Sequence, residues 1–178
     1  MIVCLGWGSL IWNPGGLKVN GEWQNDGPNA PVEYLRHSQD GRLTLVIDSD
    51  VPCSQVLWIK MDCVNIETAK EKLRIREGKI KHKFVGIWKA GQDSPMSLSG
   101  LDSWAEGVGA EAVIWTALPP KFKNIDYNKP NIEDAIAHIE RLDIDSKQLA
   151  EEYVRKTPAQ IKTPFRTKFE EYFGWTEL

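Results

Sequence analysis

The residues best suited to chemistry near the start of the chain form a short glycine-containing loop. They follow the apolar run Ile2–Leu5 and are Gly6, Trp7, Gly8, Ser9 and Leu10. Glycines at the end of a buried strand let backbone N–H groups approach a ligand closely, and such a nest suits a carboxylate or an oxyanion. An ordinary structural turn explains the same residues equally well. The loop is neither a dinucleotide loop nor a Walker A loop, because a third spaced glycine and a Gly-Lys-Ser/Thr ending are both missing.

A second residue suited to chemistry is Glu77, which follows a predicted helix from Ile66 to about Arg76. Most residues of that segment are good helix formers, and Gly78 is typical of the position that ends a helix. An acid at a helix C-terminus is disfavoured by the macrodipole, so a functional placement is one explanation for Glu77. The alternative is a surface glutamate paired with Arg74 or Arg76.

Other polar residues give weaker signals. His37, His82 and His138 lack the spacing of metal ligands, so no metal site is expected. Arg36 and Arg42 could pair with a substrate carboxylate, although arginines in a hairpin are usually solvated. Ser9 lacks the surroundings of an activated nucleophile, and the three cysteines show no cysteine–histidine signature.

The elements that must position these residues are predicted first as strands. Short apolar runs separated by turn residues indicate strands, and they cover residues 2–5, 32–35, 43–47, 56–61, 83–89 and 110–118. The stretch Gly91–Gly109 is rich in Gly and Ser and predicts a long loop.

The period changes after Pro119-Pro120, and helices are predicted. Asn131 is a suitable N-cap for a helix whose apolar face contains Ile132 and Ile139. A second helix is expected over 146–155, and a third begins at Thr163-Pro164 and ends at Gly174. The whole is an α+β arrangement in one domain, 1–178, with a β core over 1–120, a helix at about 66–77 and a helical segment over 131–174.

Two motifs and the strand between them carry a family resemblance. Val3–Pro14 resembles the opening of γ-glutamylcyclotransferases and their ChaC relatives, where a strand leads into a Tyr-Gly-Ser-Leu type loop. Leu73–Gly78 resembles the ChaC segment that carries the catalytic glutamate, and Val56–Met61 resembles the strand before it. The two motifs occur in the right order with a matching strand between them. The resemblance covers roughly residues 1–90.

The resemblance implies a fold, a reaction and a site. The fold would be a small mixed β-barrel-like core. The activity would be cyclisation of a γ-glutamyl amine or peptide to 5-oxoproline with release of the amine, as in glutathione metabolism, and it needs no cofactor. The glutamate's acid/base role would fall on Glu77, and substrate binding would fall on the loop Gly6–Leu10. The chain departs from the family at Trp7, where Tyr is usual. Compared with tyrosine, tryptophan lacks the hydroxyl group and is bulkier.

A rival for the acid/base role is Glu106. The segment Leu101–Val108 resembles the residues around the catalytic glutamate of animal γ-glutamylcyclotransferases. In the family the glutamate follows the strand closely. Glu77 lies 16 residues beyond Met61 and Glu106 lies 45 beyond it, so the spacing favours Glu77.

Composition limits the partners. The net charge of −3 gives no basic patch for nucleic acid, no apolar run is long enough for a membrane span, and the substrate class is a small molecule. Three cysteines without a paired pattern indicate a reducing, cytoplasmic environment. Two other functions stay open. One is a non-catalytic protein that binds a small molecule on the same fold, and the other is an interaction module that uses the aromatic C-terminal helices.

Overall fold

The computed structural model describes all 178 residues and shows an α+β fold. Its strands form sheets of five, four and two strands, and none of the three closes into a barrel. The helices are α1 (Ile66–Arg76), α2 (Leu101–Gly107), α3 (Ile132–Glu140), α4 (Ile144–Lys156) and α5 (Pro164–Phe173). The strands are β1 (Ile2–Gly6), β2 (Val19–Gln24), β3 (Asn29–Ala30), β4 (Val32–His37), β5 (Leu43–Ile47), β6 (Ser54–Gln55), β7 (Leu57–Met61), β8 (Val85–Lys89), β9 (Ala112–Thr116), β10 (Lys121–Phe122) and β11 (Ile125–Asp126).

The opening strand β1 lies in the middle of the five-stranded sheet, whose order is β2-β7-β1-β9-β8. It pairs antiparallel with β7 and parallel with β9. Val3 and Leu5 belong to the larger apolar core, while Cys4 belongs to a smaller core that also contains Leu73 of α1. Because both faces of β1 are covered, its sequence is a continuous apolar run rather than an alternating one. The prediction of a buried strand leading into a loop is therefore confirmed.

Helix α1 follows the predicted limits. The side chain of Asn65 accepts a hydrogen bond from the backbone N–H of Thr68, and Leu73 is buried against the sheet. Gly78 has φ +82°, a left-handed conformation that glycine adopts without steric cost, and it ends the helix. Glu77 thus lies in the tight turn between α1 and the following chain.

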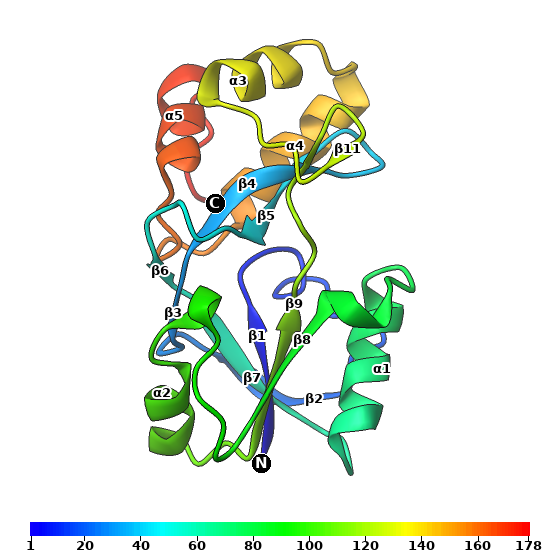
Figure 1. The fold of residues 1–178 in the computed structure, drawn as a ribbon. Helices are drawn as coiled ribbons and strands as arrows, with labels where there is room; N and C mark the ends of the chain where they lie inside the picture. Colours follow the sequence, from blue (N-terminus) through cyan, green and yellow to red (C-terminus); the bar gives the residue numbers. More distant parts are fainter.

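The hairpin β4–β5 forms the centre of the second sheet, whose order is β11-β10-β4-β5. In Figure 1 this hairpin lies in the upper half beneath α3, α4 and α5, whereas the five-stranded sheet lies in the lower half between α1 and α2. Helix α5 has Thr163 as N-cap, Pro164 at its start and Gly174 at its end, as predicted. Buried Glu33 of β4 accepts hydrogen bonds from the Thr163 hydroxyl and the Phe165 N–H, and these bonds attach the helix to the sheet.

The prediction of one long loop over Gly91–Gly109 is wrong. Helix α2 occupies Leu101–Gly107, and its two buried residues are Leu101 and Ala105. Its first turn is held by Ser94, whose hydroxyl bonds both the backbone N–H and the carboxylate of Asp102. So short a helix presents too few apolar positions for a helical period to stand out among glycines and serines.

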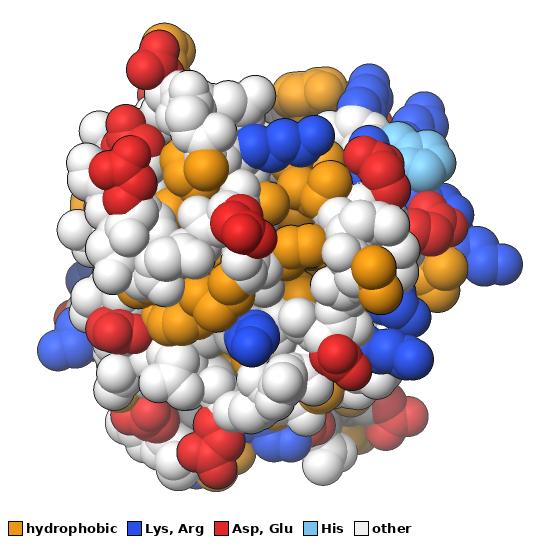
Figure 2. Space-filling view, turned by 90° about the horizontal axis from the view of Figure 1, so that it is seen from below, with side chains coloured by type: hydrophobic (Ala, Val, Ile, Leu, Met, Phe, Trp, Pro, Cys, Tyr) orange, Lys and Arg blue, Asp and Glu red, His pale blue; other side chains and the backbone are white.

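The lower end of the molecule has a mixed surface. Figure 2 shows hydrophobic side chains in the middle of this face, with separated acidic and basic side chains around them. None of the helices is long and apolar enough to cross a membrane.

Candidate functional site

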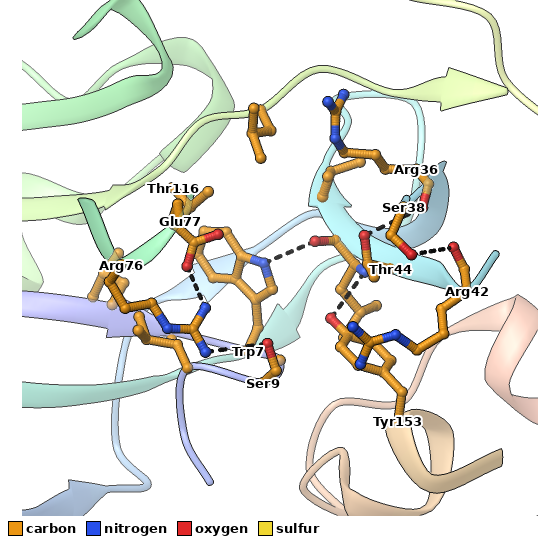
Figure 3. A pocket seen from close by; sticks show the side chains of 17 residues that line it. Trp7, Ser9, Arg36, Ser38, Arg42, Thr44, Arg76, Glu77, Thr116 and Tyr153 are labelled. Atoms are coloured by element: carbon orange, nitrogen blue, oxygen red, sulfur yellow. Dashed lines mark hydrogen bonds and ion pairs between the residues drawn. The ribbon is translucent and has the colours of Figure 1, made fainter. Parts of the chain in front are cut away.

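One cavity of the molecule lies where the two larger sheets approach each other. Its volume is about 280 Å³, close to the low end for sites that hold small ligands. Five elements or their ends contribute to it: the loop after β1, the hairpin β4–β5, the end of α1, the end of β9, and α4 (Figure 3). The lining residues are Leu5, Gly6, Trp7, Gly8, Ser9, Leu10, Arg36, Ser38, Arg42, Thr44, Leu45, Val46, Arg76, Glu77, Thr116, Leu118 and Tyr153. The structure therefore brings the predicted loop and Glu77 together in one cavity.

The loop after β1 passes very close to helix α4. A Cβ atom on Gly8 would lie 2.2 Å from the hydroxyl oxygen of Tyr153, so only glycine fits at this position without displacing the tyrosine. The loop then tightens, because the N–H of Ile11 donates to the carbonyl of Gly8 and the N–H of Asn13 donates to that of Ser9. The glycine at position 8 is thus explained by a close packing contact beside the cavity.

Trp7 forms part of the cavity wall. Its side chain is buried, and its Nε1–H donates a 3.2 Å hydrogen bond to the backbone carbonyl of Leu45 in β5. The indole is therefore tied to the hairpin, and its one donor is already used. The cavity remains open beside the ring, so the bulk of Trp7 does not fill it.

Glu77 is connected to the loop through its neighbour Arg76. The guanidinium of Arg76 lies 2.5 Å from the Glu77 carboxylate, and it also donates to Ser9 Oγ at 3.3 Å and to the Asn13 carbonyl at 2.6 Å. The side chains of Glu77 and Arg76 are only 16% and 11% exposed. Glu77 is thus paired with an arginine, as the surface interpretation supposed, but it lies in the cavity wall with its carboxylate beside Trp7 (Figure 3).

Tyr153 of α4 is a site residue that the sequence did not indicate. Its hydroxyl oxygen accepts a 3.2 Å hydrogen bond from the Leu45 N–H, and its ring is buried. Burial, with a smaller contribution from the charge of Glu77, raises the pKa of Tyr153 to about 12. The phenol is therefore protonated at neutral pH. Its hydrogen has no protein acceptor, which leaves it free to bond a ligand.

For the hairpin arginines the sequence left open pairing with a substrate carboxylate or solvation, and both line the cavity. Arg42 pairs with Asp40 at 2.6 Å and lies over the ring of Tyr153. Arg36 donates to the carbonyl of Pro119 at 2.8 Å, and burial lowers its pKa. Sequence alone could not place them here, because the hairpin reaches the cavity only through contacts with distant segments.

The remaining polar residues lie elsewhere. Glu106 is exposed on α2 and does not line the cavity. His37 and His138 contact each other with ring centroids 4.5 Å apart, away from the cavity, and His138 bonds the Gly41 carbonyl. Cys4 is buried beneath α1, and burial together with the charge of Glu77 raises the pKa of its thiol. No group of three or more metal-ligating side chains converges in the structure.

Comparisons of the chain with protein-family models, with curated proteins and with solved structures found no match. The functional interpretation therefore depends on the cavity itself. It offers one carboxylate for proton transfer, a glycine-containing backbone loop, one tyrosine hydroxyl and three arginines. A small zwitterionic or anionic molecule suits this set of groups better than an apolar one.

Proposed function

We propose that the protein is a γ-glutamylcyclotransferase-type enzyme, which converts a γ-glutamyl amine or peptide to 5-oxoproline and releases the amine. One observation carries the proposal: the carboxylate of Glu77 and the loop Gly6–Leu10 line the same cavity and are joined through Arg76. These are the two segments that resemble the family's catalytic and substrate-binding motifs. In the chain they are separated by more than 60 residues, so it is the tertiary fold, and not closeness in the sequence, that brings the two motifs together.

The reaction requires little from the enzyme beyond positioning and proton transfer. The α-amino nitrogen of the substrate attacks its own γ-carbonyl carbon, a new C–N bond closes the five-membered lactam, and the original amide C–N bond breaks. Glu77 takes a proton from the α-ammonium group and gives it to the departing amine, so the carboxylate is regenerated. Because both reacting atoms belong to one substrate, holding it in the folded conformation supplies much of the acceleration.

The other cavity groups have roles in binding. Backbone N–H groups of the Gly8–Leu10 turn can hold the substrate's α-carboxylate or the oxyanion that develops on the γ-carbonyl. The free hydrogen of the Tyr153 hydroxyl can donate to either of them. Arg76 keeps the Glu77 carboxylate fixed relative to Ser9 of the same loop. The cycle uses atoms of the substrate and the protein alone.

Two finer expectations belong to this proposal. We take the cavity between the five-stranded and four-stranded sheets as the counterpart of the family's barrel-like core. We also expect the protein to act in the cytoplasm, since its cysteines are all free.

The test is to compare Glu77→Gln with Glu106→Gln. The first change keeps the size of the cavity side chain but removes the proton acceptor, and the second alters an exposed glutamate of α2. We expect Glu77→Gln to lower kcat for 5-oxoproline release from γ-glutamyl dipeptides by about 10²- to 10⁴-fold, and Glu106→Gln to leave it unchanged. Full activity of the Glu77 variant, or loss of activity only in the Glu106 variant, would contradict the assignment.

A second candidate function is a protein that binds a small γ-glutamyl compound without converting it. The observation in its favour is the short ion pair between Glu77 and Arg76, which occupies one carboxylate oxygen of Glu77. The two functions differ in one measurement. Saturable ligand binding without any 5-oxoproline would support the binding protein, and measurable turnover would exclude it.

A further inference from the structure

The charges around the cavity do not balance. Its lining contains three arginines, Arg36, Arg42 and Arg76, but only one acid, Glu77. Arg76 pairs with Glu77, and Arg42 pairs with Asp40. Arg36 forms no ion pair. The cavity therefore has one positive charge available for a ligand.

Arg36 is held in place by backbone rather than by an acid. Its only side-chain hydrogen bond goes from Nη1 to the carbonyl of Pro119, at 2.8 Å, in the rigid Pro119-Pro120 segment after β9. The Thr44 hydroxyl bonds the Arg36 carbonyl at 3.2 Å and fixes the strand that carries it. A guanidinium has five N–H donors, so most of its donors remain free. The guanidinium is thus oriented, and its capacity to bind an anion is unused.

Desolvation makes this position unfavourable without a ligand. Burial lowers the pKa of Arg36, which means that the surroundings disfavour its positive charge. The carboxylate of Asp126 acts in the opposite direction, but Asp126 is exposed and forms no ion pair with Arg36. A partly buried cation without a partner is destabilising, and an anion that fits beside it recovers that free energy. A planar guanidinium is well matched to a carboxylate, which it can bind through two parallel bonds.

Arg36 lies on the wall opposite the catalytic carboxylate. Figure 3 shows Glu77 and Arg76 on one side of the cavity and Arg36 on the hairpin side. Of the two roles proposed for the loop near Glu77, we take the one in which it holds the α-carboxylate of the γ-glutamyl group. The anion that Arg36 can bind is therefore a second one, and it belongs to the part of the substrate beyond the bond that breaks.

We propose that Arg36 is a specificity-determining residue that binds a carboxylate on the released amine. The inference depends on the proposed function. The preferred substrates are then γ-glutamyl amino acids or peptides with a free carboxylate on the leaving portion, rather than γ-glutamyl derivatives of uncharged or cationic amines.

The test compares two substrates of the same shape, γ-glutamylalanine and γ-glutamylalaninamide, which differ in the charge of the leaving portion. For the wild-type protein we expect kcat/KM to favour the carboxylate by about 10- to 100-fold, the range that one charged hydrogen-bonded contact supplies. Most of the difference should lie in KM, because the contact is the same in the bound substrate and in the transition state.

The variant Arg36→Gln should bring the ratio of the two kcat/KM values close to one. Arg36→Lys, which keeps the charge but not the planar fork, should give an intermediate ratio. The matched control is Arg141→Gln, which removes an exposed arginine outside the cavity and should retain the wild-type ratio. Equal wild-type activity on both substrates, or an unchanged ratio in a folded Arg36→Gln protein, would overturn the proposal.

Binding separates this inference from the proposed function. Trp7 lines the cavity, so quenching of tryptophan fluorescence can follow binding of both compounds without turnover. Preferential binding of the carboxylate by the wild type but not by Arg36→Gln, without 5-oxoproline formation, would refute the enzyme and retain the role of Arg36. Turnover of both compounds at equal rates would retain the enzyme and refute the role of Arg36.

Discussion

The contact between Gly8 and Tyr153 allows a sharp test of how the cavity is built. In Gly8→Ala the added methyl carbon would lie 2.2 Å from the tyrosine oxygen, whereas ordinary contacts begin at 3.4 Å. One of the two groups must move by about 1 Å, and close-packed surroundings resist such a shift. The tyrosine is not free to move. It is buried, its oxygen bonds the Leu45 N–H, and its ring makes an edge contact with Trp12.

The expected cost has two parts. Overpacking of this kind destabilises a core by about 1–3 kcal/mol. If the tyrosine is displaced, the buried Leu45 N–H loses its partner, which costs about another 1–3 kcal/mol. We therefore expect Gly8→Ala to lower the free energy of unfolding by about 2–6 kcal/mol. The variant Tyr153→Phe removes only the partner of Leu45, so we expect it to cost about 1–3 kcal/mol.

The double variant should cost less than the sum of the single variants. Without the hydroxyl, the nearest atom to the new methyl group is the ring carbon Cζ at 3.1 Å, which requires a shift of only a few tenths of an ångström. Each single variant also leaves the Leu45 N–H without its partner, and in the double variant that cost occurs only once. The coupling between the two changes should be about 1–3 kcal/mol.

Urea unfolding of the four proteins measures this coupling. A suitable control is Gly16→Ala, because a Cβ on Gly16 meets no atom within 4 Å, and its cost should simply add to that of Tyr153→Phe. If the costs of Gly8→Ala and Tyr153→Phe also add to within about 0.5 kcal/mol, the close approach of loop and helix is refuted.

Two further predictions concern the cavity wall and the histidine pair. Trp7→Phe removes the donor to the Leu45 carbonyl and should lower the free energy of unfolding by about 1–3 kcal/mol in the same urea assay; no change would show that the indole is not held by the hairpin. Burial, and then the charge of His138, lowers the pKa of His37, so the unfolded chain binds more protons and stability should fall as pH decreases through about 6.5. His37→Gln should flatten that dependence in urea midpoints measured from pH 7.5 to 5, and an unchanged slope would contradict it.

Local signals in the sequence predicted the parts of the fold that local interactions determine. The apolar run of β1, the helix ending at Gly78, and the helix between Thr163 and Gly174 all depend on residues within a few positions of each other. Helix α2 and the two-residue strands were missed because they contain too few residues to show a period.

The residues that line the cavity could not be predicted from local sequence either. Tyr153 contacts Leu45 across 108 residues of chain, and nothing around either residue marks the contact. The same holds for Arg36, because the carbonyl that orients its guanidinium is 83 residues away in the chain. A pattern of residue types shows which groups could do chemistry, but the partners that orient them are chosen by the tertiary fold.

Glu77 shows how the two kinds of information meet. Judged by the rules for helices, an acid at the end of α1 is misplaced, since the C-terminal dipole opposes its charge. The structure supplies a compensating cation from the adjacent residue, and that same arginine reaches the loop after β1. A glutamate that only stabilised the helix would belong at the other end of it. The departure from the local rule is offset by one side chain that also attaches the acid to the proposed binding loop, an arrangement that fits the acid/base role we propose for Glu77.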